Sequence, residues 1–362
     1  MKLSIIYPYR NRDILRVQKS LKSLQSQTNK NFEVYFVNYG SDAIYTNQIE
    51  SLLKNFEFVK YSYLYTLFQP WNKSKAINSV LKNLETGCFF VADIDMIFHS
   101  TFIEKALRLS KTNEAWYFQV GFLGEGESKT SKKFEDYNIK FKSNKGATGL
   151  TLCPVKAAKR IRGFDEFYHF WGGEDTDFHI RLKNSGCIVK YFDEELLMLH
   201  QWHEIYRNRE SANLTANLQI SGIVQFNHYY LEQTARDKKA VVNNDVWGET
   251  QSKEQFEKLV EYSNTTSKKI SSSCVKIDYF LFHELPNLKP GIYNFKITAD
   301  QKNISLKATL KNVLKKSKYS YYSLKDINDK LLFHLITFYR NNPYYYRVSK
   351  DLKSITFVIN KL

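Results

Sequence analysis

The sequence predicts an α/β protein with a mainly parallel sheet, followed by a smaller α+β region. In the first half, short apolar runs alternate with stretches whose apolar residues recur at helical spacing, as in repeated strand–helix units. The chain has 362 residues, of which 43% are hydrophobic and 15% aromatic. That is enough apolar material for one large domain and a small one.

Each strand expected in the first half is a short apolar run: Leu3–Tyr7, Phe32–Val37, Phe58–Tyr63 and Phe89–Ala92. Two helices are expected between them, Ile14–Gln25 and Lys75–Leu84. In both, the apolar residues recur every three or four positions, which gives the helix one buried face. The alternation predicts an α/β domain in which helices connect the strands of a mainly parallel sheet.

The polar stretch Gly121–Gly146 interrupts this alternation. A polar segment of this length predicts a long loop, disordered or acting as a substrate gate. Regular structure is expected to resume with strands and short helices: Leu150–Val155, Lys156–Ile161, Phe178–Asn184, Ile188–Phe192 and Leu196–Leu199.

We expect the first domain to span residues 1–210, a helical connection to span 211–269, and a small basic α+β domain to span 270–362. In the last of these, the apolar runs predict strands at Val275–Phe282, Gly291–Thr298 and Ser354–Ile359, and a helix at Leu324–Tyr339.

The charge of the chain is concentrated in its last part. Lys and Arg number 53 against 37 Asp and Glu, a net +16, and residues 301–362 hold 13 basic and 3 acidic residues. A lysine-rich solvated surface is one reading. Contact with nucleic acid, anionic lipid or an acidic polymer is the other. An anionic membrane is the hypothesis for this tail, because tyrosines interleave the charges in Tyr319-Ser-Tyr-Tyr322 and Tyr344-Tyr-Tyr346.

The location of the protein is expected to be cytoplasmic, at most peripheral to the inner face of the membrane. Met1-Lys2 leads directly into a strand-like run, and no apolar stretch is long enough to cross a bilayer. The four cysteines are isolated from one another in the sequence. This spacing favours buried thiols over a disulfide framework or a cysteine zinc site.

Asp93 and Asp95 follow the apolar run at residues 89–92. They are expected at the carboxyl end of a strand, where open α/β sheets bind ligands. The two-residue spacing puts both carboxylates on one face of an extended chain. Oxygen ligands suit Mg²⁺ and Mn²⁺, and such a cation can neutralise a diphosphate. The pair taken alone also fits a turn or a helix cap.

A second cluster of acids begins a helix at Trp171-Gly-Gly-Glu-Asp-Thr-Asp177. Gly172 and Gly173 allow close approach of the backbone to a ligand, and the acids gain from the helix dipole. One of these carboxylates is a candidate general base. A simple helix cap would not require the Trp-Gly-Gly sequence that precedes the acids.

Two further groups complete the set of candidates. His200 and His203 follow another apolar strand, where an imidazole can complete a metal site begun by carboxylates, and His203 is the preferred ligand. Arg10 and Arg12 follow the first strand next to aromatic residues. Guanidinium groups suit phosphate and aromatic rings suit stacking on a base, although a solvent-facing loop is an equal alternative.

Together these segments resemble the GT-A glycosyltransferases. The order and spacing match the β-1,4-galactosyltransferase-like enzymes at four places: Tyr7-Pro-Tyr-Arg-Asn-Arg12, Trp71-Asn-Lys-Ser-Lys-Ala-Ile-Asn78, Ala92-Asp-Ile-Asp-Met96 and Trp171-Gly-Gly-Glu-Asp-Thr-Asp177. The N-terminus is also similar to family 2 glycosyltransferases. The resemblance spans roughly residues 1–205 and is more specific than any single motif.

The resemblance implies a nucleotide-sugar donor site and a metal. Arg10 and Arg12 would contact the nucleotide, Lys73 would lie near the uracil, and Asp93 would hold the ribose or support the metal. Asp95 and a histidine would ligate Mn²⁺ or Mg²⁺. The donor pocket would further include Pro8, Tyr9, Asp42, Gly172 and Gly173.

The resemblance also implies an inverting transfer from a UDP-sugar of the galactose, N-acetylgalactosamine or glucose type. Asp175 would deprotonate the hydroxyl of a glycan or glycolipid acceptor, Glu174 would orient sugar hydroxyls, and Trp171 would close over the donor. Lysine at position 73, Thr176, and the segment Asn38-Tyr-Gly-Ser-Asp42 depart from the usual pattern. These departures bear on the donor's base and sugar more than on the reaction class.

Two other classes of function remain as alternatives. One is an inactive GT-A-like or basic nucleic-acid-binding module, but it leaves the acidic clusters without a role and no nucleic-acid-binding motif is present. The other is a nucleotidyltransferase, which would use the same carboxylates, metal and diphosphate chemistry and release pyrophosphate. Surface polysaccharide synthesis, without nucleic acid as partner, is the expected setting.

Overall fold

The computed structural model describes residues 2–204, 212–300 and 320–362, which divide into two compact units. The first unit comprises residues 2–67, 71–204 and 224–249, and the second comprises 68–70, 212–223, 250–300 and 320–362. The expected first domain ended at residue 210, whereas the first unit also takes in residues 224–249.

A seven-stranded sheet forms the centre of the first unit, in the order β10-β6-β9-β4-β1-β2-β3. All its strands run parallel except β9, which is antiparallel to both neighbours. The bounds are β1 Leu3–Tyr9, β2 Phe32–Asn38, β3 Val59–Tyr63, β4 Cys88–Val91, β6 Glu114–Phe118, β9 Thr151–Pro154 and β10 Ile188–Phe192. The expected mixed α/β fold with a mainly parallel sheet is confirmed.

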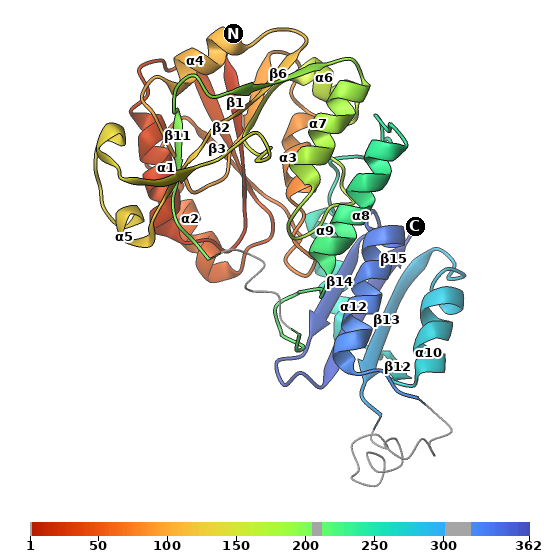
Figure 1. Cartoon of the computed structure of the whole chain (residues 1–362). Helices are drawn as coiled ribbons and strands as arrows, with labels where there is room; N and C mark the ends of the chain where they lie inside the picture. Colours follow the sequence, from red (N-terminus) through yellow and green to blue (C-terminus); the bar gives the residue numbers. More distant parts are fainter. Residues whose placement is uncertain (1, 205–211, 301–319) are drawn as a thin grey trace. The chain divides into compact units, whose positions relative to one another are not determined.

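Helices cover both faces of this sheet because successive strand residues point to opposite sides. Leu3 and Ile5 of β1 join the core beneath α1 Ile14–Gln25, α2 Ala43–Leu53 and α4 Phe102–Leu109. Ile6 joins the core beneath α3 Lys73–Leu81, α6 Val155–Arg160 and α7 Glu174–Asn184. Figure 1 shows α1 and α3 on opposite sides of β1, β2 and β3.

A second sheet of the first unit contains the stretch that the sequence indicated to be a loop. Its order is β5-β11-β7-β8, with bounds β5 Met96–Phe98, β11 Met198–His200, β7 Gly121–Leu123 and β8 Ile139–Lys142. Between β7 and β8 lie α5 Glu125–Ser128 and a short 3₁₀ turn. The expectation of a disordered loop is therefore wrong. Its apolar residues are few, but Leu123 and Tyr137 pack with Leu199 into a small core.

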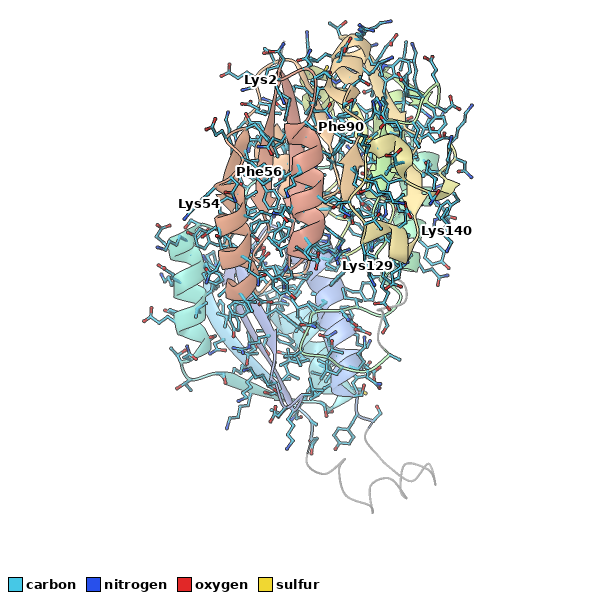
Figure 2. All side chains as sticks on the ribbon, turned by 90° about the vertical axis from the view of Figure 1, so that its left-hand side faces the viewer. Lys2, Lys54, Phe56, Phe90, Lys129 and Lys140 are labelled. Atoms are coloured by element: carbon cyan, nitrogen blue, oxygen red, sulfur yellow. The ribbon has the colours of Figure 1, made fainter. Side chains whose placement is uncertain are left out.

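The second unit is built on a four-stranded sheet in the order β12-β13-β15-β14. Its strands are β12 Lys268–Ser271, β13 Gly291–Thr298, β14 Tyr344–Val348 and β15 Ser354–Lys361. Figures 1 and 2 together show α9 (Lys253–Ser263) and α12 (Leu324–His334) on opposite faces of this sheet. The expected strands at residues 291–298 and 354–359 and the helix from Leu324 are confirmed.

One expected strand of the second unit is wrong. Residues 275–282 form α10 (Cys274–Tyr279) and the start of a π-helical turn (Phe280–Glu284). Ile277, Phe280 and Leu281 are buried, a helical spacing rather than the alternation of a strand. A short run of apolar residues cannot distinguish these two patterns.

The tyrosines expected to contact a membrane are in part buried. Tyr344, Tyr345 and Tyr346 form most of β14 and are 2%, 5% and 1% exposed, so the membrane role expected for this tyrosine cluster is wrong. Tyr319 lies outside the described residues. In the part of the chain that the structure describes, no helix is both long and apolar enough to cross a membrane.

Candidate active site

Asp93 and Asp95 lie in the turn that joins β4 to β5. The backbone carbonyl of Asp95 accepts a hydrogen bond from the Gln201 amide, at 3.0 Å. His200 also pairs with Met96 across the β5–β11 ladder. The sheet register therefore brings the turn after β4 next to the segment after β11, and with it His200 and His203.

Three side chains form a cluster fit for a divalent cation. His203 Nε2 lies 3.2 Å from Asp95 Oδ2, and His200 Nε2 lies 3.7 Å from Asp95 Oδ1. One ligand atom from each residue lies within 4.8 Å of the others. Asp95 is 6% exposed, yet its Oδ1 has no hydrogen-bond partner. A buried carboxylate oxygen without a hydrogen-bond partner is unfavourable, and a bound cation would satisfy it.

The imidazole of His203 is held in the orientation that a ligand needs. Its Nδ1 lies 2.9 Å from the carbonyl oxygen of Glu204. When Nδ1 donates that hydrogen bond, Nε2 beside Asp95 is the ring nitrogen left to bind a cation, the arrangement common for metal-binding histidines. The ring of His200 is supported by stacking on Phe122, with ring centroids 4.8 Å apart.

The electrostatics of the cluster favour an ionised carboxylate. Burial opposes the charge on Asp95, but the neighbouring imidazoles of His200 and His203 outweigh it and hold the pKa of Asp95 well below its usual range. The hydrogen bond to Asp95 in turn raises the pKa of His203. Asp95 therefore keeps its negative charge, as hard divalent cations require.

Lys73 lies among three carboxylates close to this cluster. It is the first residue of α3, whose N-terminus is capped by the Asn72 side chain. Its Nζ lies 3.1 Å from Asp175 Oδ2, 3.4 Å from Asp93 Oδ1 and 3.5 Å from Glu174 Oε1. Burial disfavours the charged amine, but the three carboxylates raise the pKa of Lys73 well above its ordinary value. In the structure, the amine of Lys73 contacts carboxylates. The expected position of Lys73 near the uracil of the donor stays a prediction.

The start of α7 aims Glu174 and Asp175 at Lys73. The preceding glycines have positive φ, 99° at Gly172 and 93° at Gly173, where residues with a side chain are strained. Asp177, in the same first turn, points elsewhere. It is fully buried and pairs with the buried Arg181, with Oδ2 2.6 Å from Nε. The residue pattern alone left the choice among these carboxylates open, and the resemblance implied Asp175. The structure makes Asp177 an anchor of the helix.

Replacing Gly173 with alanine is expected to destabilise the protein. A Cβ built on Gly173 would lie 2.7 Å from Tyr168 Cε1, and its φ of 93° would strain any other residue. The expected loss is about 1–3 kcal/mol, visible as a lower midpoint of thermal unfolding. Gly186 is the matched control, because it also has a positive φ but a Cβ added there would meet open space. Gly186→Ala should therefore lose stability through backbone strain alone.

Asp175 has the surroundings of a general base. Its side chain is 16% exposed, and its Oδ1 is buried without a hydrogen-bond partner. Burial raises the pKa of Asp175 to about 7; Lys73 opposes the rise, and Glu174 and Asp93 add to it. A carboxyl with a pKa near neutrality can accept a proton in one step and release it in the next.

This pKa predicts a pH dependence in two measurements. If Asp175 is the base, it must be ionised to act, and kcat/KM should then rise with pH through about 7. The pKa of Asp175 in the folded state lies above its ordinary value of 3.8. Between pH 3.8 and about 7, the folded protein therefore holds a proton on Asp175 that the unfolded chain has released. The free energy of unfolding should therefore fall as the pH rises through that window. A pH–rate profile and thermal melts of wild type and Asp175→Asn check both, since the variant should lack both effects.

The residues expected in the donor pocket differ in exposure. Pro8 and Tyr9 are buried in β1; the Tyr9 hydroxyl donates to the Arg12 carbonyl at 3.0 Å, and its ring packs on Phe36. The Tyr9 ring is thus a core side chain rather than a stacking surface. Arg10 Nη2 donates to the Leu67 carbonyl at 2.7 Å.

Asn11 is a residue of this region that sequence reasoning missed. Its Nδ2 donates to Asp42 Oδ2 at 2.7 Å, and its Oδ1 accepts from the Asp42 amide at 2.9 Å. Asn11 has a φ of 47°, a conformation that Asn tolerates better than most residues. The pair joins the loops after β1 and β2. Asn directly after the expected strand was the available signal.

Asn227 is a second residue that was missed. It lies on α8 (Ile223–Arg236), beyond the expected boundary of the first domain. Its Nδ2 donates to the carbonyls of His169 and Trp171, each at 3.1 Å, while the Trp171 side chain is 41% exposed. α8 therefore braces the segment that leads into Glu174 and Asp175.

Comparison with family models classifies this unit. Residues 4–161 match the model of glycosyl transferase family 2, and residues 128–206 match the model described as the N-terminal domain of galactosyltransferase. Residues 4–206 form a GT-A glycosyltransferase domain. The second match spans α7, so the glycosyltransferase assignment covers both the Asp95 cluster and the Asp175 cluster.

One solved structure to which the chain shows partial similarity is a mannosyltransferase, PcManGT from Pyrobaculum calidifontis, in complex with GDP-Man and Mn²⁺. It aligns with a TM-score of 0.40 and 13% sequence identity, over 55% of this chain and 56% of that one. The chain thus matches little more than half of the length of that protein. The comparison with curated proteins finds no significant match.

Proposed function

We propose that this glycosyltransferase domain catalyses a metal-dependent, inverting transfer from a UDP-sugar to a hydroxyl of a glycan or glycolipid acceptor. Two neighbouring features carry the proposal. The turn after β4 contributes to a carboxylate–histidine cluster, and the start of α7 holds a partly buried carboxyl with a pKa near 7. A galactose-type donor is favoured by the galactosyltransferase family match. We place the reaction in surface polysaccharide synthesis at the cytoplasmic side of the membrane.

Several residues would contribute to binding the donor. Asp95, His203 and His200 would hold Mn²⁺ or Mg²⁺, which supplies positive charge to the diphosphate leaving group. Arg10 and Arg12 follow β1 and are suited to the nucleotide phosphates. Glu174 is the candidate for orienting the hydroxyls of the donor sugar, and Trp171 for covering it.

The acceptor side depends on Asp175. Its carboxylate accepts the proton of the acceptor hydroxyl as that oxygen attacks the anomeric carbon. The new carbon–oxygen bond forms on the face opposite to the breaking bond, so the anomeric configuration inverts. UDP leaves with the electron pair of the broken bond. Lys73 sits within ion-pair distance of Asp93, Glu174 and Asp175 and offsets their mutual repulsion.

A donor panel tests the proposal. The full-length chain would be incubated with UDP-galactose, UDP-N-acetylgalactosamine, UDP-glucose and GDP-mannose, each with Mn²⁺, with Mg²⁺ and with EDTA, and release of nucleoside diphosphate would be measured. We expect one UDP-sugar to be consumed, and only with a divalent cation. Consumption that continues undiminished in EDTA, or that occurs only with GDP-mannose, would refute the proposal.

A further inference from the structure

The outer face of α10 and of the turn after it carries an exposed apolar stripe. Val275, Tyr279 and Phe282 are 74%, 55% and 67% exposed, and their spacing of four and three residues puts them on one side of a helix. Phe338, 66% exposed, adds to the stripe from the π-helical turn Leu335–Tyr339. The rings of Phe282 and Phe338 flank His334, with centroids 5.8 Å and 4.8 Å from that of His334. We call these four apolar residues the apolar patch.

The second unit does not need these side chains for its own core. The opposite side of the same helical segment is buried, and Phe280 packs on Phe295 of β13 with ring centroids 4.8 Å apart. α10 itself packs beside β12, as Figure 1 shows. A contiguous group of exposed aromatic side chains is unfavourable in water and is typical of an interaction site.

The charges around the apolar patch indicate what it meets. Lys276 and Lys289 are exposed on the same segment, and Lys330 Nζ lies 4.6 Å from the Tyr322 ring centroid. Two nearby carboxylates are engaged. Glu284 pairs with Lys268 at 2.7 Å, and Asp278 accepts a hydrogen bond from the Tyr322 hydroxyl at 3.2 Å. Glu284 is neutralised by Lys268, whereas the hydroxyl partner of Asp278 is uncharged. Lys276, Lys289 and Lys330 together outnumber Asp278, so the apolar stripe lies next to net positive charge.

The sequence between Asp300 and Ser320 is strongly basic. Residues 301–319 hold six lysines and no acidic residue. The described chain resumes at Ser320, whose carbonyl accepts a hydrogen bond from the amide of Cys274, the first residue of α10, at 3.0 Å. Ser320, the first described residue after this basic sequence, therefore lies beside the start of α10.

We propose that the apolar patch docks the chain on the surface of an anionic lipid bilayer. Phe282 and Phe338 would enter the interface between headgroups and acyl chains, while Lys276 and Lys289 remain among anionic headgroups. Aromatic and aliphatic residues beside lysines are the composition of helices that lie in this interface. A second copy of the same face fits less well, since it would bring like charges together. The inference does not depend on the identity of the donor or the acceptor.

Vesicle binding by the full-length chain tests this proposal. Co-sedimentation would be measured with vesicles of phosphatidylcholine alone and of phosphatidylcholine mixed with phosphatidylglycerol. We expect binding only to the mixed vesicles, weakened by added salt. The double variant Phe282→Glu and Phe338→Glu should lower the partition coefficient by about tenfold or more, because each glutamate removes apolar contact and adds repulsion.

The matched control changes charge by the same amount elsewhere in the second unit. Tyr262 and Leu352 are 37% and 39% exposed and lie outside the apolar patch, so Tyr262→Glu with Leu352→Glu should bind vesicles nearly as well as wild type. All proteins would be compared by thermal melting to confirm folding. Equal loss in both double variants, equal binding to neutral vesicles, or a dimer in light scattering that dissociates only in the patch variant would overturn the proposal.

A further readout separates this proposal from the proposed function. Sugar transfer to a soluble acceptor should be unchanged in the Phe282→Glu and Phe338→Glu variant, because neither residue belongs to the glycosyltransferase domain. If transfer is absent in wild type but vesicle binding depends on the apolar patch as expected, the proposed function fails and this inference stands.

Discussion

Replacing Asp175 with asparagine is expected to lower kcat by about 10²- to 10⁴-fold, the usual contribution of a general base. Asparagine has nearly the same shape but cannot accept the proton. Because Asp175 does not contact the metal cluster, KM for the donor should change little. Initial rates of nucleoside diphosphate release at saturating acceptor measure kcat, and their dependence on donor concentration gives KM.

Asp177 provides a control within the same helical turn. Its carboxylate is buried against Arg181, so Asp177→Asn leaves an unpaired buried charge and should cost about 3–5 kcal/mol of stability. Asp175→Asn should instead fold normally and lose turnover. If Asp175→Asn transferred sugar at the wild-type rate, or if the two variants differed from wild type only in stability, Asp175 would not be the base.

Replacing Asp95 with asparagine is expected to abolish most metal binding and to lower transfer by about 10³-fold or more, since a divalent cation supplies several kcal/mol of charge stabilisation to such a leaving group. The amide side chain of this variant would keep one neutral oxygen but lose the charge that a hard cation requires. His203→Ala should have a similar effect, through loss of the imidazole 3.2 Å from Asp95. Binding of Mn²⁺ can be followed by the decrease in the electron paramagnetic resonance signal of the free ion.

His99 offers a comparison outside the site. It also faces a carboxylate, with Nε2 3.1 Å from Glu135 Oε1, so His99→Ala removes a similar histidine–acid contact. We expect it to leave Mn²⁺ binding and turnover at wild-type levels. Loss of Mn²⁺ binding in His99→Ala equal to that in His203→Ala would show that the cluster at Asp95 is not the metal site.

In the first unit, helices and strands were predictable where the spacing of the apolar residues and the length of the segment indicated the same element. Residues 14–25 form a helix with the expected bounds because Val17, Leu21 and Leu24 recur at helical spacing and Asp13 caps the first turn. The strands before Asn38 and Asp93 are short apolar runs that end at polar residues. Their place in a parallel sheet then brought the ends of several strands to one region.

The prediction was wrong where local pattern is ambiguous or where contacts are distant in sequence. Residues 275–282 contain too few polar residues to distinguish a helix from a strand. The stretch at 121–146 looked like a loop because its order comes from distant partners, such as the hydrogen bonds that Lys19 donates to the Ser128 and Thr130 carbonyls. α8 was not joined to the first unit, because nothing in its sequence shows that Asn227 supports the Trp171 segment.

The candidate site was also predictable only in part. Asp93, Asp95, Glu174 and Asp175 were selected from sequence by residue type and position, and the two histidines were selected as candidates to complete the metal site. The contact of Lys73 with three acids could not be inferred, because Lys73, Asp93 and Asp175 are far apart in sequence. The choice of Asp175 over Asp177 came from the family resemblance, and the structure supplies its physical reason, because Asp177 is buried against Arg181.

The most direct test of the metal-dependent transfer is a titration of Mn²⁺ into the full-length chain after treatment with EDTA and removal of the chelator. Release of UDP from the preferred UDP-sugar, in the presence of acceptor, would be followed at each Mn²⁺ concentration. We predict no turnover without metal, saturable recovery with Mn²⁺ in wild type, and little recovery in Asp95→Asn. Turnover that is full before any metal is added, or equal recovery in Asp95→Asn, would contradict this account.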